Sequence, residues 1–321
     1  GNAALFGSAD IRITTKNSWI GMAGPAMIEG GGLGKFDPKE IGPSDIQKNN
    51  GVIDYVAEDE KEATIIAKKI LSYFQGDIKD WKADDQTQLS NIMPKDRRWS
   101  YPVRDIIKII SDIEEFTEIK PEYGKGIVTC FIRIEGKPFG LLANDSQHLG
   151  GAIDSEGADK ASSFIEMCSE YGLPLISLVD TPGFMVGPDS EKEGAVRRMS
   201  NLFKIGSKVK VPLTAIFLRK GYGLGAQAMV GGSLHEPVYT AAWPTGEFGA
   251  MGLEGAVKLG FKKELEKIED NSEREKLFNS LVEKLYDKGK AIEAAAHLEI
   301  DAVINPSETR SVILKSQKAF V

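Results

Sequence analysis

The stretch "VPLTAIFLRKGYGLGAQAM", Val211 to Met229, decides the fold. Its apolar run up to Leu218 predicts a buried strand, and the glycines that follow predict a tight turn. The small residues after the turn predict a helix that begins at Gly225–Ala226. A strand that leads through glycines into a helix is typical of a parallel sheet covered by helices.

The same alternation continues on both sides of this stretch, which places the chain in the α/β class. Two strands around a turn at Glu135–Lys137 are expected at 126–144, and Leu277, Leu281 and Leu285 mark one face of a helix. Further helices are expected at 58–74, 104–113, 157–172 and 193–207, and further strands at 10–15, 51–57, 173–180 and 236–243. Residues 75–104 lose periodicity, turn polar and are the expected linker.

Composition excludes several classes of function. The chain has 321 residues, a formal net charge of −7 and 41% hydrophobic residues. A nucleic-acid-binding protein should carry a basic face, and a membrane protein needs a long apolar run, so we expect neither partner. Cys130 and Cys168 lie in apolar patterns without metal-ligand spacing. They predict core residues of a reducing compartment, cytoplasmic or, in a eukaryote, the mitochondrial matrix, and no metal site.

Two nucleotide-binding interpretations of the glycine motifs fail. Gly221, Gly223 and Ala226 match a dinucleotide fingerprint, with Glu247 about 20 residues on, but Gly231 and Gly232 cut the following helix short. The segment "GGGLGKF" at 30–36 resembles a phosphate-binding loop. It has Glu29 in place of the first glycine and Phe36 in place of the metal-binding hydroxyl residue, so a flexible loop is the better interpretation.

A third interpretation explains why small residues open the helix. Backbone N–H groups at a helix start have no partner within the helix and lie at the positive end of its dipole. Without bulky side chains they can approach an oxyanion and stabilise it. Gly1 and Asn2 run into a second expected helix in the same way. Two such starts predict two oxyanion sites, which suits a reaction that forms an anion on each of two reactants.

Several separate motifs, in order, resemble one known family. They are "VDTPGF" at 179–184, "AAWPTGEFGAMGLEGAV" at 241–257 and "IDAVINPSETRSVI" at 300–313, together with the opening stretch. The chain resembles the carboxyltransferase of biotin-dependent acyl-CoA carboxylases, of the propionyl-CoA/acetyl-CoA carboxylase β type. The match runs from about residue 105 to the end, and residues 1–34 look like the tail of the family's first domain. The chain is therefore expected to be part of a longer polypeptide.

The resemblance implies a ClpP/crotonase-like fold, a spiral of ββα units in two related domains. Residues 1–100 are expected to hold the end of the first domain, on the CoA side, plus the linker, and 101–321 the second domain, on the biotin side. The active site is implied to lie between domains of different subunits, usually in a hexamer. The implied partners are biotin carboxyl carrier and biotin carboxylase modules, on separate subunits or in the same chain, and an acyl-CoA.

The resemblance also implies a function and its residues. The enzyme moves CO₂ from carboxybiotin to the α-carbon of an acetyl-, propionyl- or longer acyl-CoA. Gly1 and Asn2 fall where amides hold the thioester oxygen, and Gly225 and Ala226 where amides hold the biotin ureido oxygen. The family's turn reads "YGGA" but this chain has "YGLGA", which leaves Gly223 or Gly225 as donor of the first amide. The resemblance further implies that Gly223, Gly183 and Phe184 contact the biotin cofactor.

Two alternatives remain open at this point. A biotin-dependent acyl-CoA decarboxylase would use the same two sites in reverse, and a non-catalytic scaffold subunit could retain the fold. If the oxyanion interpretation holds, Ala226→Val or Gly225→Pro should lower turnover about tenfold or more in a folded protein.

Other polar residues are weaker candidates. The three histidines, His148, His235 and His297, are interpreted as structural. Asp180 either binds a ligand or shapes a turn, and Arg197 and Arg198 either bind CoA phosphates or form a solvated helix face.

Overall fold

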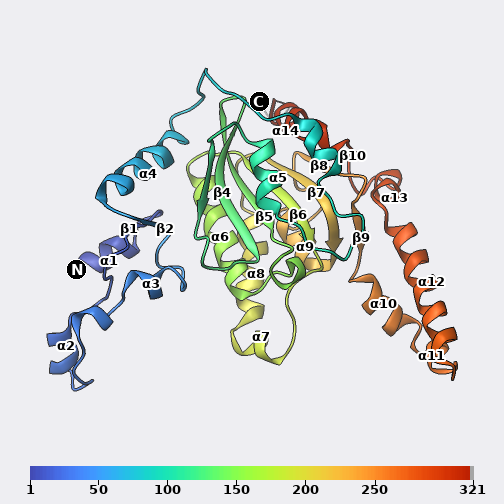
Figure 1. Cartoon of the computed structure of the whole chain (residues 1–321), viewed down its shortest axis with the longest axis horizontal. Helices are drawn as coiled ribbons and strands as arrows, with labels where there is room; N and C mark the ends of the chain where they lie inside the picture. The colour runs from blue at the N-terminus through green and yellow to red at the C-terminus, as the bar shows by residue number, and fades with distance from the viewer. Residues whose placement is uncertain (319–321) are drawn as a thin grey trace.

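The computed structural model describes residues 1–318. Within them, eight strands form one mixed sheet in the order β10-β8-β7-β6-β5-β4-β3, with β9 paired to β7 (Figure 1). Strands β3 to β5 are antiparallel neighbours, and the pairs from β5 onward are parallel. The strands are β3 (Phe116–Ile119), β4 (Ile127–Ile134), β5 (Lys137–Asn144), β6 (Leu175–Thr181), β7 (Leu213–Tyr222), β8 (Tyr239–Ala242), β9 (Glu247–Gly249) and β10 (Ala302–Val303).

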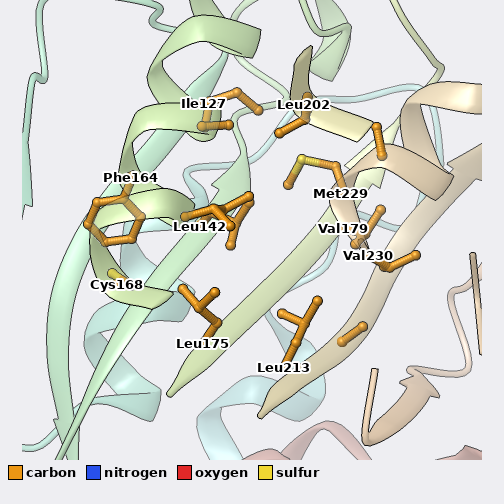
Figure 2. Close-up of a cluster of buried hydrophobic side chains, with 14 of the residues drawn as sticks. Ile127, Leu142, Phe164, Cys168, Leu175, Val179, Leu202, Leu213, Met229 and Val230 are labelled. Carbon is orange, nitrogen blue, oxygen red and sulfur yellow. The ribbon is translucent and has the colours of Figure 1, made fainter. Parts of the chain in front are cut away.

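Helices cover both faces of this sheet. Helices α6 (Ser155–Glu170) and α8 (Ala195–Gly206) lie on one face, and α5 (Val103–Ile110) and α14 (Thr309–Lys318) on the other. Alternate strand residues separate the two cores, because successive side chains of a strand point to opposite faces. In β6, Leu175 and Val179 join the core under α6 and α8, part of which Figure 2 shows. Ile176 and Leu178 join the core under α5.

The predicted hairpin between β4 and β5 is confirmed. Glu135 and Gly136 both have positive φ, 52° and 77°, as a two-residue hairpin turn requires. Every residue of β4 is buried, since helices cover both faces of the sheet. The predicted α/β class is therefore confirmed, with β4, β5 and α6 forming one ββα unit.

The N-terminal part has a small sheet of its own. Strands β1 (Ile13–Thr15) and β2 (Tyr55–Ala57) pair in parallel, and α4 (Glu60–Ser72) packs on them. The chain between these strands holds α2 (Pro25–Gly30), a 3-10 turn at Pro38–Glu40 and α3 (Ser44–Gln47). The buried Asp54 accepts hydrogen bonds from Arg12 and forms an ion pair with Lys120 of the large sheet's domain, at 3.4 Å.

The expected linker is more ordered than its polar sequence suggests. A 3-10 helix at Gln86–Asn91 interrupts it, and Leu89 and Tyr101 are buried in the core beside α5. Only a few apolar residues anchor this segment to the core. Because their spacing is irregular, they produce no periodic pattern in the sequence. It therefore wraps the large sheet instead of passing freely between domains.

Residues 253–296 form a helical arm that projects from the sheet in Figure 1. It consists of α10 (Leu253–Gly260), α11 (Lys262–Glu266) and α12 (Asn271–Gly289), and α13 (Ala291–Ala296) returns the chain to β10. The predicted leucine face of α12 is half-buried. Within residues 1–318, no helix is both long and apolar enough to cross a membrane.

Lys160 in α6 makes the stability of the fold depend on pH. Its ammonium donates hydrogen bonds to the carbonyl oxygens of Lys120 (2.7 Å) and Tyr123 (2.9 Å). Burial lowers its pKa to about 7, from an ordinary value of 10.5. Between these two values the unfolded state binds more protons than the folded state, so stability contributed by this group rises with pH.

We therefore expect the free energy of unfolding of the wild type to increase, relative to that of the Lys160→Met variant, from pH 7 towards pH 10. Urea unfolding of both proteins across this range measures the difference. Parallel pH profiles for the two proteins would contradict the expected titration of Lys160.

Candidate functional site

Helix α9 (Gly223–Met229) follows β7 directly, with Tyr222 as its N-cap residue. It therefore begins two residues earlier than predicted. The N–H groups of the first three helical residues have no partner within a helix, and the fourth is the first to reach back to the cap carbonyl. Gly223 has a positive φ of 59°, so regular helical backbone begins only after it. The candidate donors are therefore the amides of Gly223, Leu224, Gly225 and Ala226, and the predicted Gly225 and Ala226 remain among them.

The glycines of this turn are required by close backbone contacts. A Cβ on Gly225 would lie 2.6 Å from the carbonyl carbon of Gly183 and 2.9 Å from the nitrogen of Phe184. Gly223 has φ 59°, and its Cβ would lie 2.8 Å from the carbonyl oxygen of Ala250. The structure therefore brings together the predicted residues Gly183, Phe184, Gly223 and Gly225. It also means that Gly225→Pro would disturb packing as well as remove an amide.

The turn opposite α9 is held by its own hydrogen bonds. The amide of Gly183, a residue with φ 121°, donates to the hydroxyl of Thr181 at 3.1 Å. Its carbonyl accepts from the amide of Ile153 at 3.0 Å. The backbone facing α9 is therefore fixed before any ligand arrives, which is what an oxyanion site needs.

Exposed apolar side chains surround the start of α9. Leu224 lies in its first turn, Met185 and Val186 follow Phe184, and Met251 follows the residue that touches Gly223. Large apolar side chains gathered at one exposed place mark a surface that binds another molecule. Such a rim also keeps water away from the amides once it is covered.

Asp180 anchors the ends of β6 and β7 beneath this turn. Its buried carboxylate accepts hydrogen bonds from the Arg219 guanidinium, the shortest at 2.9 Å, and from the amide of Lys220 at 3.0 Å. Arg219 also donates to the carbonyl of Trp99 at 2.7 Å. Of the two interpretations of Asp180, the structure favours the one in which it shapes the turn.

Lys220 connects the same strand end to a neighbouring loop. Its ammonium donates a hydrogen bond to the carbonyl oxygen of Gly150, and burial lowers its pKa. The loop at 149–151 is thereby held beside the candidate site.

The remaining predicted residues lie elsewhere. Gly1 caps α1 (Asn2–Gly7), which lies at the outer edge of the N-terminal part, well away from α9 at the centre of the molecule (Figure 1). One chain therefore does not bring Gly1 and Asn2 together with Gly225.

The histidine, arginine and cysteine predictions have separate outcomes. His297 ends α13 and contacts the carbonyl of Glu293, and His148 faces Asp154 at 3.4 Å, as structural residues do. Arg198 pairs with Asp159 at 3.2 Å, while Arg197 is exposed. Cys130 and Cys168 are buried core residues, as predicted. Residues 1–318 contain no cluster of three potential metal ligands.

Sequence reasoning missed three functional candidates beneath α9: Arg97, Tyr222 and Glu247. Glu247 is 1% exposed and lies opposite Lys220 in the β7–β9 pair. Because Glu247 lies about 20 residues after the glycines, the dinucleotide fingerprint would place it against a ribose. Its side chain is instead buried and is not open to a ligand. The pairing of β9 with β7, which places it there, leaves no signal in a three-residue strand.

Comparison with known proteins identifies the family. A model of the carboxyl transferase domain matches residues 2–321. The methylmalonyl-CoA carboxyltransferase 12S subunit of Propionibacterium freudenreichii subsp. shermanii is 32% identical, over 97% of this chain and 60% of that protein. The methylmalonyl-CoA decarboxylase subunit alpha of Propionigenium modestum is 30% identical, over 83% of this chain and 52% of that protein. The chain thus spans little more than half the length of these relatives.

Solved structures show the same fold. A single-chain, multi-domain long-chain acyl-CoA carboxylase superimposes with a TM-score of 0.92 at 51% identity, covering 98% of this chain and 31% of that one. A transcarboxylase 12S hexamer with methylmalonyl-CoA bound gives 0.85 at 30% identity, covering 97% and 61%. The predicted crotonase-like architecture is thereby confirmed. The chain belongs to the carboxyl transferase domain family.

Proposed function

We propose that this chain is part of a biotin-dependent acyl-CoA carboxylase and transfers a carboxyl group from carboxybiotin to the α-carbon of an acyl-CoA. The observation that supports this most directly is the start of α9. There the amides of Gly223 and Leu224 are free, and Gly225 packs on the fixed Gly183–Phe184 turn. Unpaired amides held against a fixed turn are suited to stabilising an oxyanion.

The residues of this site fit a ureido group. Carboxybiotin, when bound, supplies CO₂ and then a ureido nitrogen basic enough to take the α-proton of the thioester. The α9 amides hold the ureido oxygen as negative charge develops on it, and no side chain need act as the base. The apolar rim at Met185, Val186 and Leu224 keeps water from the amides. Gly183 and Phe184 form the opposite wall.

We propose that the second oxyanion site comes from another subunit. Gly1 and Asn2 would hold the thioester oxygen, and they lie far from α9 of the same chain (Figure 1). A complete site therefore needs residues 1–100 of one copy, on the CoA side, and residues 101–321 of another, on the biotin side. A homo-oligomer, in the form of a hexamer, satisfies this requirement, with biotin carboxylase and biotin carboxyl carrier modules as partners.

The decarboxylase direction would use the same amides, and similarity to a decarboxylase subunit keeps it as the second candidate. We infer a cytoplasmic location, or the mitochondrial matrix in a eukaryote, because both cysteines are free and buried.

Reverse carboxyl transfer tests the proposed function. The full-length protein is supplied with malonyl-CoA or methylmalonyl-CoA and free biotin, and loss of the carboxylate is followed. We expect loss that requires biotin, and the preferred diacid identifies the acyl group. Reactions without biotin, and with heat-unfolded protein, are the controls. A folded oligomer that transfers nothing from either diacid or from a longer-chain one would support the scaffold alternative instead.

A further inference from the structure

A buried polar array lies directly beneath the first turn of α9. Tyr222 and Glu247 are each 1% exposed. Tyr222 is the cap residue of α9, and Glu247 begins β9, which pairs with the last three residues of β7. Both side chains therefore come from the backbone that sets where α9 begins.

The array is incompletely hydrogen-bonded. Within residues 1–318, neither carboxyl oxygen of Glu247 has a hydrogen-bond partner, and nor does the hydroxyl of Tyr222. Glu247 has an ion pair with Arg97, whose Nη1 lies 3.5 Å from Oε1. The other amino group of Arg97 donates to Glu254 at 2.6 Å. An unpaired buried polar group costs about 1–3 kcal/mol, so an uncharged side chain would be more stable at position 247.

The hydroxyl of Tyr222 and the carboxylate of Glu247 act on each other. Burial raises the pKa of Tyr222, and the negative charge of Glu247 raises it further. Burial also raises the pKa of Glu247, while Arg97 and the Tyr222 hydroxyl oppose this rise. The cap residue of α9 is thus coupled to the charge of Glu247.

We propose that Glu247 is a positioning residue for carboxyl transfer: by restraining Tyr222 it fixes the direction of the Gly223 and Leu224 amides, and Arg97 neutralises its charge. The inference rests on the proposed function. Neutralisation is needed because an uncompensated carboxylate near the amides would oppose the negative charge that they stabilise. Arg97 is suited to this because its guanidinium lies over the Tyr286 ring, 5.5 Å from the ring centroid, which holds it in place.

Turnover should depend on the protonation state of Glu247. Protonation of Glu247 removes its charge and weakens its hold on Tyr222, so turnover should fall in acid, at a pH above the ordinary carboxyl range because burial raises this pKa. The titratable and charged groups around Glu247 are Arg97, Tyr222, Asp180, Arg219, Lys220, Glu254 and Lys290, the last paired with it through an isolated β-bridge.

Four full-length proteins test the inference: wild type, Glu247→Gln, Tyr222→Phe and the double variant. Reverse transfer to biotin gives kcat and the KM for the acyl-CoA, and hydrogen exchange reports the amides of 221–229. We expect each single variant to lose about tenfold in kcat with an unchanged KM, since the α9 amides act on biotin. The double variant should lose no more than either single one, because in this inference Glu247 acts on the amides only through Tyr222. Glu247→Gln should also lose the acid limb of the pH profile.

Glu254→Gln is the matched control, since Glu254 contacts the same arginine but its side chain is 45% exposed. It should retain wild-type kcat and exchange. Faster exchange of the α9 amides in Glu247→Gln supports the inference without any activity measurement. Unchanged exchange, or additive losses in the double variant, overturns it. If the wild-type protein transfers no carboxyl group, the proposed function is refuted. This result is distinct, because the hydrogen-exchange data still test whether Glu247 positions the α9 amides.

Discussion

Leu224→Pro should lower the rate of carboxyl transfer by about 10²- to 10³-fold in a protein that remains folded. Leu224 is the second residue of α9 and 62% exposed, so its amide is free and its side chain lies outside the core. Proline lacks the N–H and has a φ suited to the first turn of a helix. The substitution therefore deletes one candidate donor without breaking a helical hydrogen bond.

Leu224→Ala is the control for this prediction, since it removes the same side chain but retains the amide. It should transfer within a few-fold of the wild type, the remaining loss being that of the apolar rim. Reverse transfer rates and circular dichroism of both variants are the measurements. Equal rates for the proline and alanine variants would show that the Leu224 amide does not stabilise the reacting anion.

Leu224→Pro is a sharper test than the two substitutions suggested by the sequence. Ala226 lies in the core under α8, so valine there would overpack the core. Any side chain at Gly225 would collide with the backbone of Gly183. Losses from either change would mix packing with catalysis.

Arg219→Met should destabilise the fold by about 3 kcal/mol, because it leaves the buried carboxylate of Asp180 with only the Lys220 ammonium, 3.8 Å away, as a counter-charge. Asp180 is fully buried and Arg219 nearly so, and this pair joins the ends of β6 and β7 to the carbonyl of Trp99. Urea unfolding at pH 7 measures the loss. The Asp180→Asn/Arg219→Met double variant should recover part of it, since no unpaired charge remains.

Arg198→Met provides the comparison for Arg219→Met. Its partner Asp159 and Arg198 itself are each about one third exposed, at 36% and 29%, so solvent screens the pair. Such pairs contribute less than about 1 kcal/mol. If Arg219→Met lowers the free energy of unfolding no more than Arg198→Met does, the Asp180–Arg219 pair does not hold the strand ends together.

The elements with strong periodicity were predicted with small errors at their ends. The hairpin of β4 and β5, α6, β6 and β7 lie where the pattern of apolar residues places them. Short elements were missed, because β9 has three residues and β10 two, too few to show a period. The start of α9 was misplaced by two residues, since Gly223 and Gly225 are poor helix formers that only their neighbours place in a helix.

The sequence by itself determined the α/β class, the glycine-rich turn after β7 and the free amides there, because periodicity and residue size act locally. It also carried the motifs of the carboxyl transferase family. Only the tertiary structure decided which amides are free, that Gly183 meets Gly225, and that Arg97, Tyr222 and Glu247 share one buried space. These contacts join residues 25 to 150 positions apart, and the packing of strands, rather than any local pattern, sets such distances.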